Sequence, residues 1–75
     1  MSNHQAYVQL ASVPHSDDWV AEIWIGDSQL SEVRKGTDGT VVEIHPKPEG
    51  GVWTIYATDH VRLINEAVRR LDEGE

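Results

Sequence analysis

Residues 19–25 read Trp-Val-Ala-Glu-Ile-Trp-Ile, and this run of branched and aromatic residues is the strongest strand signal in the chain. The tight turn Gly26-Asp27-Ser28 follows it, and residues 29–34 then predict a second, antiparallel strand. The sequence from 19 to 34 therefore predicts a β-hairpin on which the rest of the fold can be built.

Three further segments alternate in hydrophobicity with the period of a strand. They are residues 5–13 before the hairpin, residues 40–46 after it, and residues 52–57 further along the chain. Turns that contain glycine precede the last two segments, at residues 35–39 and 48–51. The sequence thus predicts an antiparallel meander of four or five strands.

The apolar pattern then changes to a helical period. Spacings of three and four residues predict one apolar stripe on a helix of about residues 59–73. Thr58 or Asp59 is expected to cap its first turn, and Gly74 is expected to end it. The stripe consists of Val61, Ile64, Val68 and Leu71, and it is expected to pack on Ile23, Ile44, Trp53 and Ile55.

A chain of 75 residues allows a single domain, here residues 1–75. The predicted fold class is α+β, an antiparallel four- to five-stranded β-meander with one C-terminal α-helix packed on one face. The chain has no cysteine, so we expect side-chain packing alone to stabilise the fold.

Strand periodicity divides the side chains of the predicted sheet between two faces. One face is almost free of charge and is the expected seat of the helix. The other combines apolar residues with glutamates, and we expect it to contact the N-terminal strand folded over it, a second copy of the chain, or another protein. The first face collects Trp19, Ala21, Ile23, Ile25, Val33, Val42, Ile44, Trp53, Ile55 and Ala57. The second collects Val20, Glu22, Trp24, Leu30, Glu32, Arg34, Val41, Glu43, His45, Val52, Thr54 and Tyr56.

Candidate partner-binding residues lie on this second face. Trp24 and Tyr56 carry large amphipathic rings of the kind that anchor protein interfaces. Carboxylates around them favour a protein partner with a basic surface. Isolated apolar residues are also common on sheet faces that bind nothing, so that alternative stays open. The candidate set is Glu22, Trp24, Glu32, Glu43, His45 and Tyr56.

The charge balance argues against several classes of partner. The chain carries 13 acidic and 6 basic residues and a net charge of −7. Phosphate backbones and anionic membranes are bound through clustered Lys and Arg, so we expect no direct nucleic-acid binding and no membrane binding. The negative charge serves either solubility or docking onto a basic partner. A cytoplasmic location is expected.

Motifs that carry chemistry are missing from the sequence. The four histidines are dispersed without the spacing of a metal site. The serines lack a nucleophile-elbow setting, and the glycines lie in turns between strands rather than in a phosphate-binding loop. The sequence therefore predicts a protein without cofactor or metal that is not an enzyme.

Three segments resemble a group of short bacterial and phage-borne proteins of unknown function. They are Val20-Ala21-Glu22-Ile23-Trp24, Val42-Glu43-Ile44-His45-Pro46 and the C-terminal helix. The resemblance implies a meander-plus-helix fold and assigns no functional residue. In size, acidity and lack of cysteine, the chain is also similar in character to anti-CRISPR proteins, which are phage inhibitors that bind and block a nuclease complex.

These features together predict a small acidic, non-enzymatic protein that binds a protein partner and inhibits or regulates it, as a phage anti-defence inhibitor would. Two alternatives stay open. One is an immunity protein or antitoxin that neutralises a cognate toxin. The other is a homodimeric accessory module.

Overall fold

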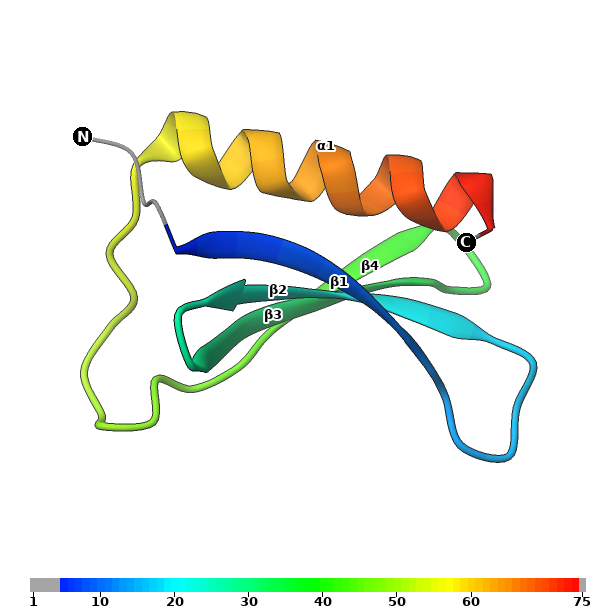
Figure 1. Ribbon diagram of the computed structural model, residues 1–75, viewed down its shortest axis with the longest axis horizontal. Helices are drawn as coiled ribbons and strands as arrows, with labels where there is room; N and C mark the ends of the chain where they lie inside the picture. Colours follow the sequence, from blue (N-terminus) through cyan, green and yellow to red (C-terminus); the bar gives the residue numbers. More distant parts are fainter. Residues whose placement is uncertain (1–4, 75) are drawn as a thin grey trace.

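The computed structural model describes residues 5–74. Within this range, four antiparallel strands form one sheet in the order β1-β2-β3-β4, and a helix lies across one face of it (Figure 1). The predicted α+β meander with a C-terminal helix is thereby confirmed. The elements are β1 (Ala6–Ser12), β2 (Trp19–Ile25), β3 (Ser28–Lys35), β4 (Thr40–Ile44) and α1 (Ala57–Glu73).

The core lies between α1 and the sheet face formed by β1, β2 and β3. Ile23, Val33 and Leu63 are completely buried there. Burying a side chain of this size contributes about 1.5–3 kcal/mol, so a few such residues account for much of the stability of so small a domain. The core cluster consists of Val8, Ala21, Ile23, Leu30, Val33, Leu63, Ala67 and Leu71, with Ile25, Trp53, Ile55, Ile64 and Val68 packed against it.

A β-bulge in the pairing of β2 with β3 moves one side chain into the core. Ile23 pairs with Ser31. The next residue of β2, Trp24, pairs with Gln29, which leaves Leu30 as an extra residue of β3. A bulge interrupts the alternation of side chains between the two faces, and Leu30 is only 2% exposed. The prediction that Leu30 lies on the face opposite the helix is therefore wrong.

The segment that was expected to form a fifth strand is irregular. Trp53 and Ile55 pack against the core, and their immediate neighbours are exposed. The indole N–H of Trp53 donates a hydrogen bond to the main-chain oxygen of His45 at 2.8 Å, and α1 already begins at Ala57. The alternating hydrophobicity of residues 52–57 therefore correctly indicates which side chains enter the core. The segment nevertheless pairs with no strand of the sheet.

The start of α1 also differs from the prediction. The helix begins at Ala57, and its N-cap residue is Tyr56, which makes no side-chain capping hydrogen bond. The expectation that Thr58 or Asp59 caps the helix is wrong. Asp59 instead lies buried in the first turn, where its Oδ1 is 3.7 Å from Nη2 of Arg62. A carboxylate in this turn is favoured by the helix dipole.

The buried side of α1 is rotated relative to the predicted stripe. Val61 is 60% exposed, so its predicted packing against the sheet is wrong. Because an α-helix turns once per about 3.6 residues, Val61 lies about 120° around the helix from Ala67, the centre of the buried side, and therefore falls outside it. The helix residues in the core are Leu63, Ala67 and Leu71, and Ile64 and Val68 pack beside them.

The C-terminal end of α1 is set by Gly74, as the sequence predicts. Its φ of 71° is left-handed, and its N–H donates to the main-chain oxygen of Leu71 at 3.2 Å. Glycine adopts this conformation without a steric penalty. Nearby, Nζ of Lys35 lies 3.1 Å from Oδ1 of Asp72 and links the end of β3 to the last turn of the helix.

The helix covers β1, β2 and β3 and leaves β4 uncovered. A helix is about 10 Å wide and neighbouring strands are about 4.8 Å apart, so one helix shields two or three strands. Every residue of β4 is exposed, including Val42 at 37% and Ile44 at 58%. Trp19, at the outer end of β2, is 45% exposed. The expected burial of these three residues under the helix is therefore wrong.

No helix in the part of the chain that the structure describes is both long and apolar enough to cross a membrane.

Candidate protein-interaction face

The sheet face opposite α1 carries most of the predicted site residues, and we call it the open face. Strand pairing identifies its members, because directly paired residues point to the same side of a sheet. β1 contributes Tyr7, Gln9 and Ala11, β2 contributes Val20, Glu22 and Trp24, β3 contributes Gln29, Glu32 and Arg34, and β4 contributes Val41 and Glu43.

Three carboxylates form a row across the open face, which we call the acidic row. Glu32 pairs with Glu22 on one side and with Glu43 on the other. Paired residues of adjacent strands have Cβ atoms about 4.5–5.5 Å apart, and like charges at such positions are destabilising. The register thus places three negative charges side by side on neighbouring strands.

Two contacts moderate this repulsion. Nη1 of Arg34 lies 2.8 Å from Oε1 of Glu43 and 3.6 Å from Oε2 of Glu32. Oε1 of Glu22 accepts a hydrogen bond from the indole N–H of Trp24 at 3.0 Å. Three carboxylates and one guanidinium leave the acidic row with a net charge of −2. Since the carboxylate of Glu43 is 61% exposed, its ion pair with Arg34 is expected to contribute little to stability.

Two aromatic rings lie beside the acidic row, and we call them the aromatic pair. The rings of Tyr7 and Trp24 stack with centroids 6.5 Å apart and planes inclined by 8°. Tyr7 is 44% exposed, and Trp24 is half-buried. Tyr7 was missed as a site residue by the sequence analysis, because its position opposite Trp24 depends on the register between β1 and β2.

The structure brings four of the six predicted site residues together on the open face. Glu22, Trp24, Glu32 and Glu43 all belong to it. Tyr56 does not, because it precedes α1, which covers the opposite face, and the irregular segment before it does not extend the sheet. It is 54% exposed.

The main chain of His45 connects three segments of the fold. Its main-chain N–H donates to the oxygen of Leu30 at 2.8 Å, and its own oxygen accepts the indole N–H of Trp53. These two bonds tie the end of β4 to the bulge and to the segment that leads into α1. The main chain of His45 therefore positions the segment between β4 and α1. His45 belongs to neither the acidic row nor the aromatic pair.

The N-terminal strand does not fold over the open face. β1 pairs with β2 along the full length of both strands and lies beside Trp24 within the sheet. Trp24 and Val41 remain the apolar residues with exposed surface there from the predicted set, with Tyr7 and Ala11 added by β1, whereas Val20 is buried. The apolar surface is thus smaller than predicted, and its aromatic part is concentrated at one end of β1 and β2.

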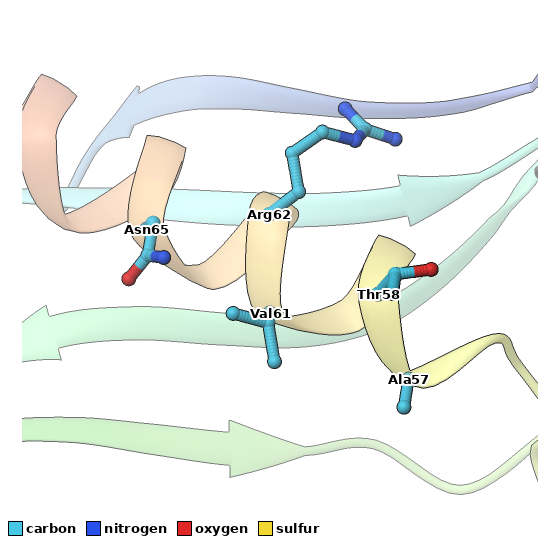
Figure 2. A pocket seen from close by; sticks show the side chains of 5 residues that line it. All are labelled: Ala57, Thr58, Val61, Arg62 and Asn65. Atoms are coloured by element: carbon cyan, nitrogen blue, oxygen red, sulfur yellow. The ribbon is translucent and has the colours of Figure 1, made fainter.

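Two of the hollows in residues 5–74 lie outside the open face. Figure 2 shows the first, of about 530 Å³, on the outer side of α1. Its five lining residues include one ionisable side chain, that of Arg62. The second, of about 470 Å³, lies between the end of β4 and the segment before α1. Ile44, Trp53 and His60 line it, and the buried Nε2 of His60 has no hydrogen-bond partner in residues 5–74.

Among the described residues, no group of three or more His, Asp or Glu side chains is arranged to hold a metal ion. Comparison of the chain with protein-family models, with curated proteins and with solved structures finds no match.

Proposed function

We propose that this protein is a non-enzymatic binding module that docks its open face onto a basic surface of a protein partner and thereby inhibits or regulates that partner. One observation carries the proposal. The acidic row and the aromatic pair lie side by side on a sheet face that the single helix of residues 5–74 leaves uncovered.

The aromatic pair supplies an anchor. Tyr and Trp are enriched among the residues that dominate binding energy, because they offer a large contact area at a low cost in conformational entropy. Stacking on Tyr7 and the hydrogen bond to Glu22 both restrict the ring of Trp24 before any partner arrives. A partner therefore meets a preformed aromatic surface.

The acidic row supplies attraction at longer range. A net charge of −7 on a small domain draws a positively charged surface toward it, and a local row of carboxylates orients the encounter. The directly opposed positions of Glu22 and Glu32 cost some stability in the free protein. A partner's Lys or Arg side chains would relieve this repulsion on binding.

A comparison of two double variants tests the proposal. Glu22→Lys/Glu43→Lys reverses two charges of the acidic row, and Asp27→Lys/Glu49→Lys makes the same change in net charge at exposed turn residues. Each tagged protein, checked for folding by circular dichroism, captures proteins from a host lysate. We expect at least one protein to be captured by Asp27→Lys/Glu49→Lys, the turn variant, and not by Glu22→Lys/Glu43→Lys, the acidic-row variant.

The association rate of that captured protein is expected to fall at least about tenfold with the acidic-row variant, and to fall with rising salt. Equal binding of every captured protein by both variants would overturn the proposal.

A further inference from the structure

The two outer edges of the sheet present main-chain groups in different surroundings. In an antiparallel pair, residues alternate between bonding the neighbouring strand and facing away from it. The hydrogen bonds from Gly36 N–H to the oxygen of Gly39 and from His45 N–H to the oxygen of Leu30 mark the bonded positions between β3 and β4. Alternation from these positions identifies the β4 residues whose N–H and C=O face the free edge: Thr40, Val42 and Ile44.

The edge formed by β1 is covered at its centre. The main-chain N–H of Gly26 bonds the oxygen of Gln5, and the same alternation directs the main chain of Val8 outward. The guanidinium of Arg70, on α1, donates a hydrogen bond from Nη1 to the oxygen of Val8 at 2.8 Å. A charged side chain on an edge strand is a common means of preventing the addition of another strand. β1 is therefore blocked by the helix.

The edge formed by β4 is open. All five of its residues are exposed, and its three outward-facing residues carry no charge. Val42 and Ile44 expose aliphatic side chains on the helix side of the strand, where α1 does not bury them. An exposed, uncharged edge strand with apolar side chains is a template for pairing with another strand.

We propose that β4 pairs antiparallel with β4 of a second copy of this chain about a two-fold axis at Val42, giving a dimer with a continuous eight-stranded sheet, four strands from each copy.

The sequence of β4 fits a copy of itself in this register. Val42 lies opposite Val42 of the second copy, and Thr40 lies opposite Ile44 in both directions, so every outward N–H and C=O of these residues meets a partner. On the other side of the strand, Glu43 lies opposite Val41 of the second copy. The two Glu43 carboxylates are therefore not directly opposed.

The ends of the seam bring no like charges together. Continuing the same register beyond β4 would place Pro46 of each copy opposite Asp38 of the other, and Lys47 opposite Thr37.

The dimer is closed, because the second edge of each copy is covered by Arg70. Figure 2 shows the side chains of Ala57 and Val61 directed toward the β4 side of the helix, which extends the apolar surface beside the seam. Stable interfaces bury about 1,200–2,000 Å², more than a five-residue strand pair provides alone, so we expect a reversible dimer of micromolar affinity.

Sedimentation velocity across a range of micromolar concentrations tests the dimer. The full chain is expected to pass from monomer to dimer as its concentration rises. Val42→Lys is expected to raise the dissociation constant at least about tenfold, because a charge then lies in the seam. Ser12→Lys places the same residue on the exposed end of β1 and is expected to leave the dimer unchanged.

A second measurement keeps the test independent of the folding of Val42→Lys. In the unmodified chain, amide exchange at Val42 and Ile44 is expected to slow at least about tenfold from low to high concentration, with no change at Leu10 on the β1 edge.

A chain that stays monomeric at every concentration, or exchange at Val42 that does not depend on concentration, would overturn the proposal. Neither result bears on the open face, so the proposed function is tested separately.

Discussion

Glu22 on β2 and Glu32 on β3 occupy directly opposed positions in the sheet, so their carboxylates share one face of two adjacent strands. Like charges in this arrangement destabilise a sheet, and Glu22 is also held in place by the indole N–H of Trp24. The opposed carboxylates of the open face therefore lower the stability of the free protein, and removing one of them should raise the free energy of unfolding.

We expect Glu22→Gln to raise the free energy of unfolding by about 0.2–1 kcal/mol at low ionic strength, because it removes one of two opposed charges and keeps an acceptor for Trp24. The gain is expected to shrink at high salt, where the charges are screened. Urea denaturation at two salt concentrations measures it, with Glu49→Gln in an exposed turn as the control. A loss of stability at low salt would contradict this account of the acidic row.

Leu63→Ala is expected to lower the free energy of unfolding by about 2–5 kcal/mol, because Leu63 is completely buried and its truncation leaves a cavity. Val61→Ala, on the exposed side of the same helix, is expected to change it by less than about 0.5 kcal/mol. Thermal denaturation of both variants measures the contrast. Similar losses of stability at the two positions would mean that a different side of α1 faces the sheet.

Ser31→Ala is expected to leave stability unchanged or raise it. The hydroxyl of Ser31 is completely buried and has no hydrogen-bond partner within residues 5–74, and such a group costs about 1–3 kcal/mol to desolvate. Removing it eliminates that cost and leaves only a small change in volume. Chemical denaturation is the measurement. A marked loss of stability would show that the hydroxyl has a partner in solution.

Arg70→Gln is expected to cost about 1.5–3 kcal/mol of stability, because it removes a charged donor from the oxygen of Val8. Arg69→Gln is the matched control, since Arg69 pairs at the surface with Glu73 and contributes little. Uncovering β1 is also expected to produce assemblies larger than a dimer, which sedimentation would detect. Equal stability of the two variants would contradict the role assigned to Arg70.

Much of the local structure follows from the sequence by itself. Residues 19–25 form the predicted strand with no change in its bounds, because branched and aromatic residues favour extended backbone wherever they lie. The helical period after residue 58 and the glycine at position 74 likewise predict a helix and its end. Alternation also identified Trp53 and Ile55 as inward-facing, although the segment that contains them forms no strand.

The candidate site was predictable only in part. Trp24 and the three glutamates were recognised from the parity of their strands, since side chains alternate along any strand. Their assembly into a row depends on the registers between strands, which the sequence did not specify. Tyr7 was missed for the same reason, and Tyr56 was misplaced because period-two burial was taken for strand pairing.

The sequence alone determined which segments are strands and helix, because backbone propensity and hydrophobic period act over a few residues. Only the tertiary structure decided that the bulge carries Leu30 into the core, that Arg70 covers one edge of the sheet, and that β4 lies beyond the reach of the helix. Each of these features depends on how segments distant in the sequence pack against one another. One helix is too narrow to cover four strands, and this determines which surfaces of the sheet stay exposed.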